Sequence, residues 1–135
     1  MKIVLDTNVL VSALLSPSGI PVKILNLIFN GVITLVYDNS ILAEYIEVLN
    51  REKFKIQKER TNLIIDFISK ECEFCIANPQ KVLFSDEADR KFYELFKTGE
   101  IDYLITGNRK DFPNENFIVT PRTFIEREYK PVGQK

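Results

Sequence analysis

Short apolar runs alternate along the chain with longer segments in which apolar residues recur at helical spacing. The first run covers residues 3–5, and the apolar positions that follow at residues 9–14 have the periodicity of a helix. A short, continuous apolar run is typical of a strand buried on both faces, as in a parallel sheet. Further runs predict strands at residues 32–37, 73–76, 101–106 and 117–119.

Helices are predicted between these strands, and one of them carries clear start and stop signals. Pro21 opens this helix at a position where its missing N–H is harmless, and Gly31 ends it. The remaining helices are expected at residues 41–50, around 63–68, at 85–97 and at 121–129. We expect the charged segment 51–60 to be a solvated connection between two helices.

The alternation of strands and helices predicts the fold class. We expect an α/β protein with three layers, α/β/α, around a central, mainly parallel sheet of about five strands. A chain of 135 residues is long enough to bury a core and short enough to form a single domain. We place that domain at residues 1–130 and expect residues 131–135 to form a frayed tail.

Composition removes several classes of function. The chain has no histidine, which excludes His-based general acid–base chemistry, the Ser-His-Asp triad and imidazole metal sites. Lys and Arg number 18 against 19 Asp and Glu, so a polyanion has to be met by a local patch or through metal ions. No apolar run approaches the roughly 20 residues of a membrane span, and the amino end lacks the apolar stretch of a signal peptide. We therefore expect a cytoplasmic protein with no membrane contact.

Two cysteines, Cys72 and Cys75, form a C-x-x-C motif. A structural zinc site needs four ligands, usually Cys or His, and the chain offers only these two. A redox pair would need a strand-to-helix junction, whereas this motif lies where a predicted helix gives way to a strand. We predict two reduced thiols that behave as small apolar side chains.

Acidic and amide side chains gather where the predicted strands end. Asp6 follows the first strand directly, Glu44 lies near the start of the helix after the second strand, and Asp89 lies in the helix before the fourth. Asn108 and Asp111 follow the fourth strand. Each has an ordinary structural explanation, because Asp and Asn cap helices and form turns, and acids are favoured at helix starts. Capping and turn formation therefore stay open as alternatives for these residues.

The coincidence of these positions favours a joint role. If the strand ends share one edge of the sheet, Asp6, Glu44 and Asp89 converge there with Asn108 or Asp111. Several unpaired carboxylates at close range repel one another, and some stay protonated unless a cation neutralises them. Oxygen ligands without His or Cys select Mg²⁺ or Mn²⁺, the usual ions of phosphodiester hydrolysis.

Five segments carry a family resemblance. They are VLDTNV at residues 4–9, LAEY around Glu44, DEADRKFYEL from Asp86, IDYLITGNRKDF from Ile101 and IVTPRTFIE from Ile118. This pattern resembles the PIN-domain ribonucleases, in particular the bacterial and archaeal group described as toxins of toxin–antitoxin pairs. The resemblance covers almost the whole chain. The third and fourth segments, in this order and with the first at the amino end, are its most specific part.

The resemblance implies a metal site. Asp6, Glu44 and Asp89 match the three metal-binding acids of the family, and Asn108 falls where many relatives place a fourth acid. The implied metal set is therefore Asp6, Glu44, Asp89 and Asn108. The implied catalytic set contains the same three acids together with Asp111, and either Asp111 or Asp102 would supply the charge that Asn108 lacks.

Other residues are implied in supporting roles. Those expected to orient the carboxylates or a phosphate, or to complete the acidic cluster, are Thr7, Asn8, Asp86, Asp102 and Thr106. Arg109 and Lys110 are expected to hold flanking phosphates of RNA. Residue 88 is Ala where relatives often carry a further acid, which leaves open whether one or two ions bind.

The function implied by the resemblance is a metal-dependent endoribonuclease that acts on single-stranded RNA, with Mg²⁺ or Mn²⁺ as its cofactor. The metal would activate a water for attack on the phosphorus. The resemblance also implies a small antitoxin as partner, and a homodimer. Two alternatives remain beside it. One is a module that binds RNA or a partner with little catalysis. The other is an aspartyl-phosphate phosphohydrolase with Asp6 as nucleophile, although Asn8 stands where that chemistry usually has a second Asp.

Overall fold

The computed structural model describes residues 1–129, which contain five strands and six helices. The strands are β1 (Lys2–Leu5), β2 (Thr34–Tyr37), β3 (Glu73–Phe74), β4 (Tyr103–Ile105) and β5 (Ile118–Val119). The helices are α1 (Thr7–Leu15), α2 (Ile20–Phe29), α3 (Asn39–Leu49), α4 (Lys58–Glu71), α5 (Arg90–Thr98) and α6 (Pro121–Glu128). Three 3₁₀ turns lie in the connections, η1 (Glu52–Phe54), η2 (Glu87–Asp89) and η3 (Arg109–Asp111). The predicted tail and residue 130 lie outside the described residues.

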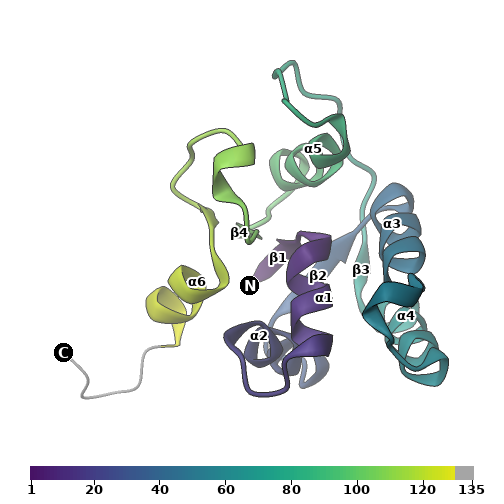
Figure 1. Ribbon diagram of the computed structural model, residues 1–135. Coiled ribbons are helices and arrows are strands. Elements are labelled where there is room, and N and C mark those ends of the chain that lie inside the picture. Colours follow the sequence, from purple (N-terminus) through teal and green to yellow (C-terminus); the bar gives the residue numbers. More distant parts are fainter. Residues whose placement is uncertain (130–135) are drawn as a thin grey trace.

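The five strands form one sheet in the order β3-β2-β1-β4-β5, and every neighbouring pair is parallel. β1 is central, because Ile3 pairs with Leu35 of β2 on one side and with Tyr103 of β4 on the other. In Figure 1, α1 and α2 form one group of helices beside the sheet, and α3 and α4 form another. The predicted three-layer α/β/α fold with a parallel sheet is confirmed.

Burial accounts for the central position of β1. Ile3, Val4 and Leu5 are each at most 1% exposed, so both faces of this strand are covered. The core against which they pack also contains Tyr45 of α3 and Phe92 of α5, which are fully buried. The strand therefore ends at a fixed point inside the molecule, and the residue that follows it is held in place.

Several boundaries differ from the prediction. β3 and β4 are shorter than the strands predicted at residues 73–76 and 101–106, and α3 begins two residues before the predicted start at residue 41. β2 begins at Thr34 rather than at residue 32, because Gly31 adopts a φ of 72° in the preceding turn and Val32 is left 54% exposed. α5 begins at Arg90 rather than at residue 85, because residues 87–89 form η2 instead of a first helical turn. The charged segment 51–60 is only partly a connection, since it contains η1 and the start of α4.

Helices α1 and α2 pack against each other and are bent by 100° at the break between them. α1 buries most of its length, including Leu10 and Ala13, which are at most 1% exposed. Across residues 1–129, no single helix is long and apolar enough to cross a membrane, and α1 and α2 meet that criterion only as a bent pair.

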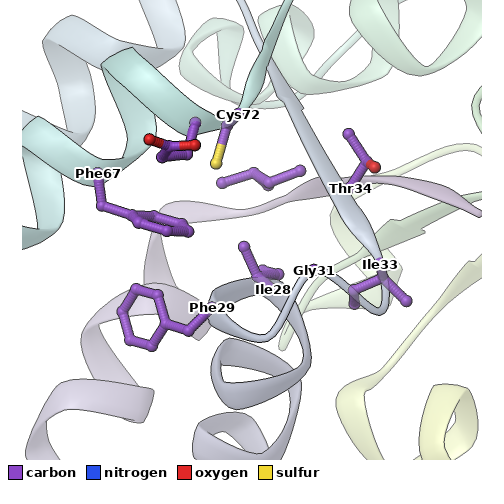
Figure 2. A pocket seen from close by; sticks show the side chains of 9 residues that line it. Ile28, Phe29, Gly31, Ile33, Thr34, Phe67 and Cys72 are labelled. Atoms are coloured by element: carbon purple, nitrogen blue, oxygen red, sulfur yellow. The ribbon is translucent and has the colours of Figure 1, made fainter.

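Cys72 and Cys75 are free thiols, as predicted. Cys72 follows the last residue of α4 and is partly buried, and this burial raises the pKa of its thiol to about 12. Its side chain lines a cavity of about 150 Å³ at the amino end of β2, where Phe29 and Phe67 pack edge to face with ring centroids 4.8 Å apart (Figure 2). A thiol with such a pKa is neutral at pH 7 and a poor nucleophile.

Candidate active site

Asp6 stands at the carboxyl end of β1, between that strand and α1. Its backbone N–H donates to the carbonyl oxygen of Ile105 at 2.9 Å, which extends the pairing of β1 with β4 by one residue. Its side chain is held by Thr106, whose hydroxyl donates to Asp6 Oδ2 at 2.7 Å. Asp6 stands at the N-cap of α1 without a side-chain capping hydrogen bond, although the backbone N–H groups of Thr7 and Asn8 act on its carboxylate and lower its pKa. The residue is only 5% exposed.

The electrostatics of Asp6 are unfavourable for a carboxylate. Burial raises its pKa above the ordinary value for Asp, and the negative charge of Glu44 raises it further, while the hydrogen bond from Thr106 opposes both effects. A buried, partly compensated acid at the carboxyl edge of a parallel sheet lies where open α/β folds bind their ligands.

Glu44 reaches this site from α3. Its Oε2 accepts a hydrogen bond from the Thr7 hydroxyl at the start of α1. Its Oε1 forms an ion pair with Lys91 Nζ of α5 at 2.7 Å, and the two side chains are only 25% and 20% exposed. Glu44 therefore lies between three elements, α1, α3 and α5, and points to the end of β1.

Asp89 completes the group from η2. Burial raises the pKa of its carboxyl to about 6, and the charges of Asp6, Asp86 and Asp111 add to this shift, while the Lys91 ammonium opposes it. Because these charges raise the pKa of Asp89, each of these three acids lies within electrostatic reach of Asp89. The structure thus brings Asp6, Glu44 and Asp89 to one edge of the sheet.

The fourth position combines an amide and an acid. Asn108 Nδ2 donates to Asp111 Oδ2 at 2.7 Å, and the two residues lie in the turn that follows β4. The Asn108 backbone N–H donates to Thr106 Oγ1 at 3.0 Å. A continuous chain of hydrogen bonds therefore runs from Asn108 through Thr106 to Asp6, which fixes the orientation of the buried carboxylate.

Asp102 does not belong to this cluster, and the prediction that placed it there is wrong. It precedes β4, and its Oδ2 accepts a hydrogen bond from the backbone N–H of Lys2 at 2.8 Å, at the amino end of β1. Strands rise about 3.3 Å per residue, so three residues of β4 separate it from Thr106 by roughly 10 Å or more along the sheet.

Two further supporting residues have simple structural positions. Asp86 is exposed and caps η2, since its Oδ1 accepts a hydrogen bond from the backbone N–H of Ala88 at 3.0 Å. Capping of η2 therefore accounts for the position of Asp86, although its charge also acts on Asp89. Asn8 is exposed on the first turn of α1.

Of the two residues expected to bind phosphate, Arg109 has structural partners. Its guanidinium donates to the carbonyl oxygen of Ile118 at 2.8 Å and to Asn114 Oδ1 at 2.6 Å, so it ties η3 to the loop before β5. Lys110 is exposed beside it. The geometry therefore leaves Lys110 as the better placed of the two for contact with a phosphate.

The sequence interpretation missed two residues of the site. Lys91 supplies a positive charge inside the acidic group, and its pairing with Glu44 joins α5 to α3. Tyr45 is fully buried and donates its hydroxyl to the carbonyl oxygen of Leu5 at 2.5 Å, so α3 also holds the last residue of β1. Its only sequence signal is a polar atom on an apolar helix face, which does not reveal the partner.

The donor set fits a hard divalent cation, although its members are not gathered at liganding distance. In residues 1–129, no three Asp, Glu or Cys side chains lie close enough to hold a metal ion. Both oxygens of Glu44 and one of Asp6 are bonded to protein donors instead. The acids are all oxygen ligands, and the raised pKa values of Asp6 and Asp89 show negative charge that a cation would relieve.

Comparison with known proteins identifies the family of this chain. Residues 2–110 match the PIN domain family, and this range contains Asp6, Glu44, Asp89 and Asn108. The chain is also 34% identical over 140 residues to Uncharacterized protein MJ1680 of Methanocaldococcus jannaschii, covering 93% of this chain and 90% of that protein. No solved structure matches the chain significantly. PIN domains have nuclease-type functions and generally use divalent metal ions. This protein belongs to the PIN domain family.

Proposed function

We propose that this protein is a metal-dependent endoribonuclease that hydrolyses phosphodiester bonds of single-stranded RNA. The observation that carries the proposal is the crowding of acids at the end of β1. Asp6 is buried, Glu44 raises its pKa, and Asp89 has a pKa of about 6 because of burial and of neighbouring acids. A fold does not gather such charges for stability, because they repel one another. Together with membership of the PIN domain family, this supports nuclease chemistry.

Asp6, Glu44 and Asp89 would hold Mg²⁺ or Mn²⁺, with Asn108 and Asp111 beside them. The ion, when bound, supplies Lewis-acid activation of water and stabilises the charge that develops on the phosphate. No side chain has to act as a nucleophile, which agrees with a chain that contains no histidine and a Cys72 that is neutral at pH 7.

The remaining residues orient these acids and the RNA. Thr106 fixes one oxygen of Asp6, and Thr7 fixes one oxygen of Glu44, so both carboxylates are oriented before substrate arrives. Lys110 is exposed next to the site and would bind a flanking phosphate. The polar contacts expected for RNA are thus to its backbone, which predicts weak dependence on base sequence from these residues.

We further propose that this protein is the toxin of a toxin–antitoxin pair, with a small antitoxin protein as its partner. We also propose that it acts as a homodimer in the cytoplasm. The resemblance of the sequence to PIN-domain toxins supports these assignments. Co-purification from cells that express the flanking genes tests the antitoxin, and light scattering of the purified protein tests the homodimer.

The decisive experiment is cleavage of single-stranded RNA by purified protein with Mg²⁺ or Mn²⁺. D6N should reduce the rate at least about 100-fold, because an essential acid is lost, and EDTA should abolish cleavage of the wild type. The matched control is D66N, which neutralises an exposed Asp on α4 whose partner is Lys70, and it should cleave as the wild type does.

Three results would contradict the proposal. Undiminished cleavage by D6N would show that the activity lies elsewhere or in a contaminant. RNA binding by folded protein without any cleavage would favour the binding module instead. A stable acyl-phosphate on Asp6 after incubation with acetyl phosphate would favour the phosphohydrolase.

A further inference from the structure

Within residues 1–129, Lys91 is the basic residue that pairs with Glu44 and acts on Asp89. It lies in the first turn of α5, and its Nζ contacts Glu44 Oε1 at 2.7 Å and the carbonyl oxygen of Ala88 at 2.6 Å. The contact with Ala88 fixes the ammonium on η2, next to Asp89. The ammonium therefore bridges two of the elements, α3 and η2, that carry the site.

This ion pair differs from the others in the described part of the chain. The side chains of Lys91 and Glu44 are 20% and 25% exposed, whereas each of the other ion pairs contains at least one side chain that is 39% exposed or more. Reduced contact with water strengthens the attraction between two opposite charges and makes the loss of either one costly. We therefore treat the Lys91–Glu44 ion pair as part of the candidate site and not as an ordinary surface ion pair.

The position of Lys91 conflicts with metal binding by Glu44. Glu44 Oε2 is held by the Thr7 hydroxyl, and Oε1 is held by Lys91. A divalent cation that takes Glu44 as a ligand must approach these same oxygens, and it is repelled by an ammonium at contact distance. Lys91 and the cation are thus competitors for one carboxylate.

We propose that Lys91 is an internal counterion that neutralises Glu44 in the metal-free protein and is displaced from Glu44 when a divalent ion binds. This inference rests on the proposed function, because it takes the metal site as given. The lysine side chain is a flexible four-carbon stem, so its ammonium can leave Glu44 without movement of the backbone. Lys91 is in this sense a positioning residue: it keeps Glu44 oriented while metal is absent, and it lowers the affinity for metal.

The test compares two variants that each remove one lysine from α5. K91M removes the counterion and keeps an unbranched side chain of similar length. K97M is the matched control, because Lys97 pairs with Glu115, away from the acids, at 3.0 Å. Binding of Mn²⁺ is measured by calorimetry on protein freed of metal, and thermal unfolding is followed in EDTA.

We expect K91M to bind Mn²⁺ about tenfold more tightly than the wild type, the order expected from removing one unit charge near a divalent ion. K97M should change the affinity less than about threefold, because its charge is remote and screened by water. In EDTA, K91M should unfold about 2–5 °C below the wild type, since the acids then lack their counterion. Added Mn²⁺ should remove that difference.

A double variant separates the counterion role from a general effect of the mutation. In the E44Q background, K91M should change Mn²⁺ affinity no more than K97M does, because the competition for a charged Glu44 is gone. K91R keeps the positive charge and should bind Mn²⁺ as the wild type does. K91Q replaces K91M in the comparison if the methionine variant does not fold.

The outcomes separate failure of this inference from failure of the proposed function. Wild-type protein that is folded and binds no Mn²⁺ overturns the metal site and the Lys91 inference together. Wild-type protein that binds Mn²⁺, with K91M binding it no more tightly than K97M, overturns the Lys91 inference alone. Weaker binding by K91M also overturns it, since Lys91 would then assist the metal.

Discussion

The hydroxyl of Thr106 donates to Oδ2 of Asp6 at 2.7 Å and thereby links the ends of the two central strands, β4 and β1. Thr106 is fully buried, and its oxygen also accepts the backbone N–H of Asn108 at 3.0 Å. One side chain thus orients the most buried acid of the site and fixes the turn that carries Asn108 and Asp111.

We expect Thr106→Val to destabilise the protein by about 1–3 kcal/mol, because a methyl group of the same shape leaves a buried carboxylate oxygen and a backbone N–H without their partner. Thr106→Ser keeps the hydroxyl and should lose less. The free energy of unfolding, measured with urea at pH 7 in EDTA, checks this. Equal losses for the two variants would show that packing, and not the hydrogen bond, holds this position.

The raised pKa of Asp89 predicts a pH dependence of stability. An Asp with a pKa of 3.8 in the unfolded chain and about 6 in the folded protein binds its proton more tightly when folded. The folded state therefore carries more protons between these two values, and its stability falls as the pH rises through this window. Asp89→Asn should lack this fall.

Melting temperatures of the wild type and of Asp89→Asn, both in EDTA, measure this effect. We expect the advantage of the variant to grow from pH 4 to about pH 6.5, to reach about 2–4 °C and to stay constant above that pH. A difference that does not change with pH would mean that Asp89 titrates normally in the folded protein.

Arg109 and Lys110 are adjacent, and the structure predicts opposite phenotypes for them. Arg109→Ala should lower the free energy of unfolding by about 1–3 kcal/mol, because the carbonyl of Ile118 and the side chain of Asn114 lose their donor. Lys110→Ala should leave stability unchanged and should weaken RNA binding. The slope of log binding constant against log salt concentration should become less steep by about one, as expected for the loss of one phosphate contact.

Urea unfolding and RNA binding at several salt concentrations check this pair, with binding measured in the D6N background to keep the RNA intact. A stable Arg109→Ala variant with weakened RNA binding would reverse the assignment and restore Arg109 as the phosphate ligand.

Much of this structure could be predicted from the sequence, because its strands and helices are marked by local patterns of apolar and polar residues. The apolar run at residues 3–5 gave the buried central strand, and the polar residues behind it gave Asp6 at the carboxyl edge. Glu44 was predictable because it is an acid among apolar residues of one helix. Parallel pairing then brings such positions to one edge of the sheet.

The positions of Lys91 and Asp102 could not be predicted from local sequence patterns. Lys91 meets Glu44 because α5 packs against α3, and this tertiary contact cannot be predicted from the sequence of either helix. Asp102 is close in sequence to the other candidates, but it stands before the apolar residues of β4 and not after them. The structural partners of Arg109, the Ile118 carbonyl of β5 and the Asn114 side chain, could not be predicted from the sequence because they depend on tertiary packing.

The link between Asp6 and Thr106 spans 100 residues of the chain, and this separation affects how the protein is made. Asp6 is synthesised well before β4 and the Thr106 hydroxyl that orient its carboxylate. Under the proposed function, we therefore expect a nascent chain that has not yet reached Thr106 to hold Asp6 without its orienting hydroxyl and to cleave RNA less well than the folded protein.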